Sequence, residues 1–145
     1  MAGNKITNPN AETILPNVET ILLVDDELEL LRVNSRLLTT LGYQILSAKS
    51  GPEALDVLLS HDVDLIVLDM LMPGMDGVET LRQIRELRPD QKVVILSAYA
   101  EPEKVEEVKK LGVLAYLKKP LSLKTMTTTL RSALDGHQNE DMTSD

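Results

Sequence analysis

The chain has no cysteine and no tryptophan, and it has no long hydrophobic run. Without Cys, disulfides and thiolate metal sites are excluded, and the composition fits a reducing compartment. Aliphatic runs such as ILLV and LIVL are far shorter than the roughly 20 residues that a membrane-spanning helix needs. The N-terminal residues contain an early lysine but no apolar segment, so they do not resemble a secretory signal. We therefore expect a cytoplasmic protein that does not associate with membranes.

The chain also lacks a dense basic segment. Its formal net charge is -8, and residues 135–145 hold four acidic residues and no Lys or Arg. Residues 21–134 carry 14 basic and 17 acidic residues. Duplex DNA and RNA are bound by clusters of Lys and Arg that contact phosphates. We therefore expect no direct binding to nucleic acid.

What the chain does contain is enough apolar material for one folded domain. Hydrophobic residues make up 43% of its 145 residues, which is too much for a disordered chain. Residues 1–19 are rich in Asn, Thr and Pro without periodicity, which predicts a flexible arm. The acidic residues 135–145 predict a disordered tail. The folded domain is therefore expected over residues 20–134.

Within this domain, short apolar runs alternate with segments that have helical spacing. Gly42 and Gly112 lie where helices are expected to end, and Pro52 and Pro102 lie where helices are expected to start. Each amphipathic segment places apolar residues three or four positions apart. The expected strands are Ile21–Val24, Tyr43–Ala48, Leu65–Leu68, Val93–Leu96 and Val113–Leu117.

Five repeats of strand and helix predict an α/β fold with helices on both faces of a parallel sheet. The runs ILLV, LIVL and VVIL are apolar on both faces, so they belong in the centre of the sheet. The run YQILSA includes polar residues, which is typical of an edge strand. These features predict a flavodoxin-like, doubly wound sheet of five strands in the order 2-1-3-4-5, with five helices. Such sheets bind ligands beyond the carboxyl ends of the strands.

Polar residues that could form a site directly follow these strands. Asp25 and Asp26 follow the first strand, Asp69 the third, Ser97 the fourth and Lys119 the fifth. Taken singly, the paired aspartates could cap a helix, and Asp69 could be a turn residue before Pro-Gly. Together they would bring three carboxylates to one edge, where their mutual repulsion favours a bound cation. An all-oxygen donor set is typical of a Mg²⁺ site.

The segments VDDE, LDMLMPGMDG, ILSAYA and YLKKP resemble, in order and spacing, the receiver domain of bacterial two-component response regulators. The resemblance spans about Thr20 to Leu134. It implies that Asp69 accepts a phosphoryl group from the phosphohistidine of a histidine kinase or histidine phosphotransfer domain. It further implies that Lys119, preceding a cis proline, pairs with the Asp69 carboxylate before phosphorylation and with the phosphoryl group afterwards. It also implies that Mg²⁺ is bound directly by Asp26, Asp69 and the backbone carbonyl of Leu71, and through water by Asp25.

The resemblance also implies how the signal is read. Ser97 and Tyr116 match the switch pair of the family. On phosphorylation the Ser97 hydroxyl would move to a phosphoryl oxygen and Tyr116 would swing inward, which alters a surface made by the fourth helix, fifth strand and fifth helix. That surface would bind a downstream protein target, and a homodimer formed on phosphorylation is a further expectation. Leu71 and Tyr99 occupy the positions that tune the lifetime of the phosphoryl group. Because neither can orient a water molecule, we expect slow self-dephosphorylation.

Two alternatives concern the kind of protein. A phosphatase of the haloacid dehalogenase type needs a second Asp two residues after the first, where this chain has Leu71. We therefore expect no enzyme beyond one that promotes its own phosphorylation and dephosphorylation. The domain could instead belong to a hybrid kinase or phosphorelay and pass the phosphoryl group onward, and the sequence leaves this open. By analogy, Glu27–Leu41 and the loop after the fifth strand would contact the kinase.

Overall fold

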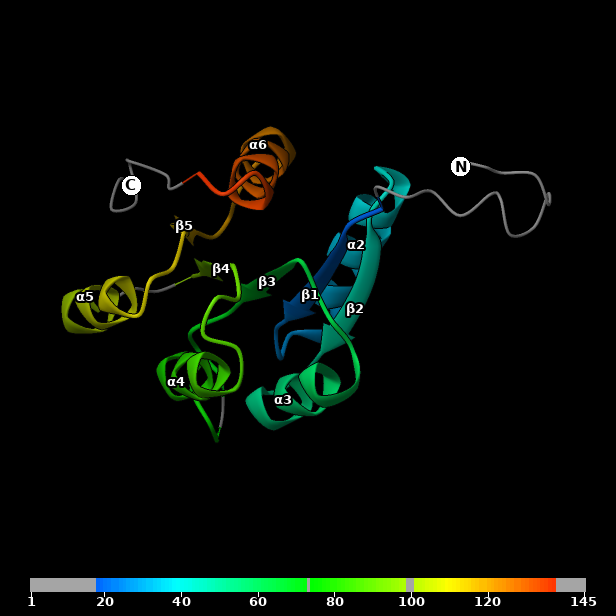
Figure 1. Ribbon diagram of the computed structural model, residues 1–145. Helices are drawn as coiled ribbons and strands as arrows, with labels where there is room; N and C mark the ends of the chain where they lie inside the picture. Colours follow the sequence, from blue (N-terminus) through cyan, green and yellow to red (C-terminus); the bar gives the residue numbers. More distant parts are fainter. Residues whose placement is uncertain (1–17, 73, 99–100, 138–145) are drawn as a thin grey trace.

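The computed structural model describes residues 18–72, 74–98 and 101–137. Strands and helices alternate along these residues, as the sequence predicts (Figure 1). In chain order they are β1 (Thr20–Val24), α2 (Leu28–Thr40), β2 (Gln44–Ala48), α3 (Gly51–Ser60), β3 (Leu65–Leu68), α4 (Gly77–Leu87), β4 (Val93–Ser97), α5 (Pro102–Lys110), β5 (Ala115–Lys118) and α6 (Leu123–Leu134).

The five strands form one parallel sheet in the order β2-β1-β3-β4-β5. The predicted order and the edge position of β2 are therefore confirmed. The fifth strand differs from its prediction, because pairing begins at Ala115 and extends to Lys118. Val113 is buried, with 1% of its surface exposed, although it precedes the strand. Val113 is apolar because it packs in the hydrophobic core, and not because it pairs within the sheet.

Two hydrophobic cores lie on opposite faces of the sheet. Helices α2 and α6 cover one face, and α3, α4 and α5 cover the other (Figure 1). Alternate residues of β1 serve the two cores, with Ile21 and Leu23 facing α2 and α6, and Leu22 and Val24 facing the other helices. Each such buried aliphatic side chain stabilises the fold by about 1.5–3 kcal/mol. This burial on both faces explains why the central strands have uninterrupted apolar sequences.

Local sequence signals determine where several helices begin and end. Ser50 and Ser122 accept hydrogen bonds from backbone N–H groups in the first turns of α3 and α6, at 3.2 and 3.1 Å. Pro102 begins α5, as predicted. Gly42 and Gly112 follow α2 and α5 with φ of 103° and 86°, a conformation that other residues rarely adopt.

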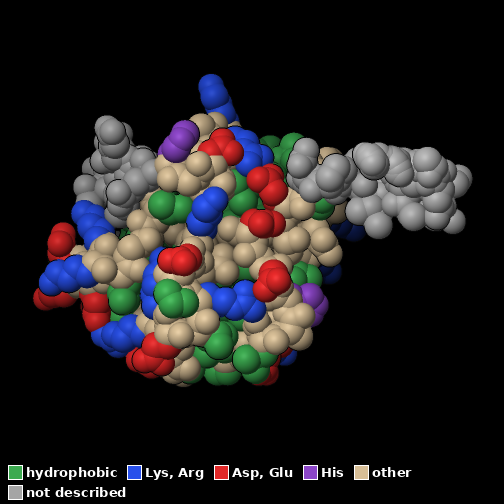
Figure 2. All heavy atoms as spheres, viewed as in Figure 1, with side chains coloured by type: hydrophobic (Ala, Val, Ile, Leu, Met, Phe, Trp, Pro, Cys, Tyr) green, Lys and Arg blue, Asp and Glu red, His purple; other side chains and the backbone are tan. Residues whose placement is uncertain are grey.

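The predicted arm and tail lie mostly outside the described residues. Residues 1–17 and 138–145 are not described, so the division into arm, domain and tail stays a prediction. Among the described residues, no helix is long and apolar enough to cross a membrane. On the face shown in Figure 2, Lys and Arg side chains are interspersed with Asp and Glu.

Candidate functional site

The predicted site residues lie at the carboxyl edge of the sheet because backbone hydrogen bonds extend the strand pairing past the strand ends. The N–H of Asp25 donates to the carbonyl of Ala48 at 3.1 Å, and the N–H of Asp69 donates to that of Val24 at 3.0 Å. The N–H of Lys119 donates to the carbonyl of Ser97 at 2.9 Å. The backbone at Asp25, Asp69 and Lys119 is thus held by the sheet itself.

Three carboxylates meet at this edge. Asp25, Asp26 and Asp69 each offer one oxygen, and these oxygens lie within 4.8 Å of one another. Asp25 and Asp69 are 8% and 5% exposed. Burial raises the pKa of Asp69, and the charge of Asp25 raises it further, against hydrogen bonds from Leu71 and Ser97 and the charge of Lys119. Closely spaced hard oxygen donors with this excess of negative charge fit a divalent cation such as Mg²⁺.

Lys119 provides the positive charge that the sequence predicted at this edge. Its Nζ lies 2.7 Å from Oδ2 of Asp25 and 3.5 Å from Oδ2 of Asp69. Burial alone would lower the pKa of Lys119, but hydrogen bonding to Asp25 and the charge of Asp69 outweigh it and raise that pKa. The shortest contact is therefore with Asp25, whereas the sequence reasoning had considered only Asp69. The Lys119–Pro120 peptide is cis.

Ser97 and Tyr116 also lie at the predicted positions in β4 and β5. Ser97 is fully buried and makes a side-chain hydrogen bond with Asp69. Tyr116 is 5% exposed and packs in the core with α3, α4 and α5. Burial and the charge of Asp69 raise the pKa of Tyr116. Tyr116 is thus already buried beside an unmodified Asp69, and its inward movement on phosphorylation stays a prediction.

The loop after β3 is closed tightly against the start of α4. The N–H of Leu71 donates to Oδ1 of Asp69 at 3.2 Å, and that of Gly77 donates to the carbonyl of Met70 at 3.0 Å. A Cβ on Gly77 would lie 2.5 Å from Cα of Met70, so only glycine fits there. Leu71 is 45% exposed. Tyr99, the other residue predicted to tune phosphoryl lifetime, lies outside the described residues.

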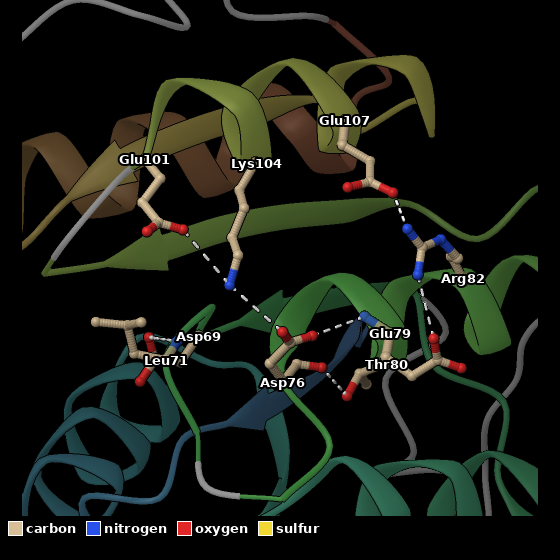
Figure 3. A network of polar contacts seen from close by, with 9 residues as sticks. All are labelled: Asp69, Leu71, Asp76, Glu79, Thr80, Arg82, Glu101, Lys104 and Glu107. Carbon is tan, nitrogen blue, oxygen red and sulfur yellow. Dashed lines mark hydrogen bonds and ion pairs between the residues drawn. The ribbon is translucent and has the colours of Figure 1, made fainter.

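Asp76 joins this loop to α5, which the sequence reasoning missed (Figure 3). Its Oδ1 caps α4 by accepting from the N–H of Glu79 at 3.0 Å. Its Oδ2 lies 3.4 Å from Nζ of Lys104, which also pairs with Glu101 at 3.6 Å. The capping hydrogen bond from the Glu79 N–H stabilises the carboxylate and lowers the pKa of Asp76. An Asp followed by Gly is typical of a turn, and nothing in the sequence connects Asp76 with Lys104, which lies 28 positions away.

Glu27 was also missed as a site residue. Its Oε1 lies 3.3 Å from Nζ of Lys119, and its backbone N–H donates to Oδ1 of Asp25 at 2.9 Å. Its place directly after Asp26 is the only sequence signal. Glu27 and Lys119 also line a groove of about 400 Å³ between α2 and α6. The other lining residues are Leu30, Asn34, Leu96, Ala98, Pro120, Leu121 and Met126.

Comparisons with known proteins agree with this geometry. The model of the response regulator receiver domain matches residues 21–131. Sporulation initiation phosphotransferase F of Bacillus subtilis is 34% identical over 116 residues, which are 80% of this chain and 94% of that protein. Sensor kinase CckA of Brucella abortus is 38% identical over 125 residues, which are 85% of this chain but only 13% of the kinase.

A solved structure shows the same fold. The response regulator protein TrrA of Thermotoga maritima, in complex with Mg²⁺-BeF, superposes with a TM-score of 0.72 and 29% identity. The match covers 80% of this chain and 99% of that one. The family model matches the chain from β1 into α6. The chain therefore belongs to the response regulator receiver domain family of two-component and phosphorelay signalling.

Proposed function

We propose that this receiver domain is a phosphorylation-dependent switch whose acceptor is Asp69. The observation that carries the proposal is the buried Asp69 carboxylate, which lies beside Asp25, Asp26 and Lys119 at the ligand-binding edge of the sheet. An oxygen of Asp69 attacks the phosphorus of a phosphohistidine, the P–N bond breaks, and the imidazole leaves with the electron pair. The product is a mixed anhydride on Asp69.

The surrounding residues have distinct roles in this proposal. Asp25, Asp26, Asp69 and the backbone carbonyl of Leu71 would hold Mg²⁺, which when bound offsets charge on the phosphoryl oxygens. The fit rests on three carboxylate oxygens within 4.8 Å of one another. Lys119 exchanges its contact with Asp69 for one with the phosphoryl group. Its ammonium is already placed 3.5 Å from the acceptor, so little reorganisation is needed.

The signal leaves the site through Ser97 and Tyr116. When the Ser97 hydroxyl turns from the Asp69 carboxylate to a phosphoryl oxygen, the packing around Tyr116 changes. Tyr116 lies on β5, so the surface formed by α5, β5 and α6 has two arrangements whose balance phosphorylation shifts. A downstream protein target, or a second copy of the chain, would bind that surface.

The proposed phosphoryl donor is a histidine kinase or a histidine phosphotransfer domain. It would approach over α2 and the loop after β5, where the groove of about 400 Å³ leads to Lys119. Leu28 and Val33 on α2 are 60% and 47% exposed, which suits contact with another protein. We propose no contact with nucleic acid or membrane, and we place the switch in the cytoplasm.

A phosphorelay intermediate is the second candidate. The similarity to sporulation initiation phosphotransferase F extends over 94% of that protein, so a receiver alone can make up nearly a whole phosphotransferase. In this variant the phosphoryl group passes from Asp69 to the histidine of a phosphotransfer domain. One measurement distinguishes the two candidates. The protein is phosphorylated on Asp69 with labelled phosphate and mixed with histidine phosphotransfer domains of the same organism; transfer of the label to their histidine favours the phosphorelay intermediate.

We do not propose turnover of external phosphoesters. A phosphatase using Asp69 as its nucleophile would need a general acid two residues later. Leu71 occupies that position, and its side chain is 45% exposed at the rim of the site. The chemistry of the site is therefore limited to gain and loss of its own phosphoryl group.

Intact-mass spectrometry tests the proposal. The protein is incubated with Mg²⁺ and acetyl phosphate beside Asp69→Asn, with EDTA in a parallel sample. We expect one phosphoryl group on the wild type and none on the variant or with EDTA. Mass is preferable to fluorescence because the chain has no Trp. If the wild type gained no phosphoryl group from any donor, the proposed function would be wrong.

A further inference from the structure

Glu27 brings a fourth carboxylate to the site, in addition to those of the proposed metal set. It is not among the carboxylates that lie within 4.8 Å of one another. Its Oε1 lies 3.3 Å from the ammonium nitrogen of Lys119. It is the N-cap residue of α2, but its side chain makes no capping hydrogen bond, so the helix start does not depend on the carboxylate. This negative charge is fixed at the mouth of the site.

We propose that Glu27 determines which phosphoryl donors the site prefers. It disfavours small donors that carry a high negative charge, relative to donors whose phosphoryl group is attached to a neutral or cationic nitrogen. Phosphohistidine belongs to the second class because its leaving group is an imidazole. This inference rests on the proposed role of Asp69 as the phosphoryl acceptor.

The charges around Lys119 are the basis of this preference. Its ammonium has three carboxylate neighbours, namely Asp25, Glu27 and Asp69, at 2.7, 3.3 and 3.5 Å. A donor oxygen that contacts this ammonium comes within about 6 Å of the Glu27 carboxylate, at which distance like charges in water disfavour binding roughly threefold per unit charge. Because the Glu27 side chain is 64% exposed, salt reduces this factor. The repulsion therefore grows with the negative charge of the donor.

Two small donors separate this effect from a general change in reactivity. With acetyl phosphate, the bond from Asp69 to phosphorus forms, the P–O bond breaks, and acetate leaves with the electron pair. With phosphoramidate, the P–N bond breaks, and ammonia leaves because the nitrogen already carries its proton. Near neutral pH acetyl phosphate is essentially a dianion, whereas phosphoramidate is a zwitterion with less net negative charge.

The experiment compares Glu27→Gln with wild type and with Glu29→Gln. Glu29 lies in the first turn of α2, is 81% exposed, and pairs with Arg32 and not with Lys119. Both variants therefore remove the same charge from the same helix end. Initial phosphorylation rates are measured by intact mass with each donor below saturation, in excess Mg²⁺, at low and high salt. Urea unfolding of all three proteins verifies that the variants are folded.

We expect Glu27→Gln to accelerate phosphorylation by acetyl phosphate roughly three- to tenfold at low salt. The ratio of the acetyl phosphate rate to the phosphoramidate rate should rise about threefold and return toward the wild-type ratio at high salt. Glu29→Gln should leave this ratio nearly unchanged. A purely structural role for Glu27 would alter both donor rates together and would leave the ratio fixed.

Three results would overturn the inference. An unchanged ratio in Glu27→Gln would do so, and so would an equal change in Glu29→Gln; in both cases the proposed function would stand if wild type is phosphorylated. A wild-type protein that accepts phosphoryl groups from neither donor would overturn the proposed function and, with it, the role of Glu27.

Discussion

Asp69 is held where its charge is costly to the fold. Burial raises the pKa of Asp69, and the Asp25 carboxylate adds to this effect. As pH rises past the ordinary value of 3.8, the unfolded chain therefore loses this proton before the folded protein does. Stability falls as pH rises through that window, and the penalty then stays constant at higher pH. A bound cation would relieve it.

Replacing this carboxylate by its neutral isostere should therefore stabilise the metal-free protein. We expect Asp69→Asn in EDTA to raise the free energy of unfolding at pH 7 by about 1 kcal/mol. The difference should disappear as pH falls below 3.8, where both states are protonated. Urea unfolding at both pH values measures it. With Mg²⁺ the wild type should regain stability and the variant less; an Asp69→Asn protein less stable in EDTA at pH 7 would contradict this account.

The lifetime of the phosphoryl group is a second question at the residue scale. Leu71 is 45% exposed beside Asp69, the proposed acceptor, and presents no hydrogen-bonding side chain to an attacking water. We expect Leu71→Asn to shorten the lifetime roughly tenfold, because a carboxamide can orient that water. The decay of the phosphorylated mass after removal of the donor measures it, with Leu71→Met as the apolar control. An unchanged decay rate in Leu71→Asn would rule out this role.

At the scale of elements, one arginine on α4 fastens the end of α5. Nε of Arg85 donates to the carbonyl of Leu111 at 2.6 Å, and Nη2 donates to that of Gly112 at 3.2 Å. Its Nη1 donates to the carbonyl of Gln91 at 2.5 Å. Burial lowers the pKa of Arg85, and the charge of Asp90 opposes this effect. The guanidinium stays charged, and three backbone carbonyls accept its hydrogen bonds. The C-terminus of α5 is thus held from a neighbouring helix.

Removing these hydrogen bonds should destabilise the protein more than is usual for a partly exposed residue. We expect Arg85→Ala to cost about 2–3 kcal/mol, because three carbonyls lose a charged donor. The stability of Arg85→Lys should lie between those of wild type and Arg85→Ala, because one ammonium group cannot make all the hydrogen bonds of the planar guanidinium. Arg82→Ala is the matched control on the same helix, where the pairs with Glu79 and Glu107 are about half exposed. Arg82→Ala should lower the free energy of unfolding by less than about 1 kcal/mol. If urea unfolding showed equal losses for Arg82→Ala and Arg85→Ala, the special role of Arg85 would be refuted.

At the scale of the whole molecule, the last helix is fastened to the start of the first strand. Arg131 of α6 donates to both carboxylate oxygens of Glu19, at 2.9 and 2.7 Å. The hydrogen bond from Arg131 lowers the pKa of Glu19 below its ordinary value of 4.5. The unfolded chain thus takes up this proton first as pH falls. The stability from this pair is fully present above 4.5 and is lost as pH falls through the lowered pKa.

We expect Arg131→Gln to lower stability at pH 7 by roughly 0.5–1 kcal/mol, a small value because the pair is partly exposed. The difference should shrink at high salt and vanish once Glu19 is protonated. The matched control is Arg32→Gln, whose partner Glu29 lies one turn away on the same helix and is more exposed. It should cost less than about 0.5 kcal/mol. Denaturant unfolding at several pH values between acid and neutral measures both variants. A stability difference between wild type and Arg131→Gln that persisted in acid would contradict this role of the Glu19 pair.

The amino-acid sequence by itself determined the order of strands and helices, and it showed which polar residues directly follow the central strands. An apolar run such as Leu65–Leu68 predicts a buried strand, and the polar Asp69 directly after it predicts where that strand ends. Both signals lie in adjacent residues, so no structure is needed to detect them. The fifth strand was displaced in the prediction because packing and pairing both require apolar residues. Val113 is buried without being paired.

Only the tertiary structure decided which charges meet. Lys119 pairs with Asp25 and Glu27, which precede it by 94 and 92 positions, and Lys104 reaches Asp76 across 28 positions. Ion pairs have no sequence period, because a long flexible side chain binds whichever carboxylate the packed elements bring within reach. The sequence thus identified Asp69 and Lys119 as candidate site residues, while the fold added the Glu27 carboxylate beside Lys119.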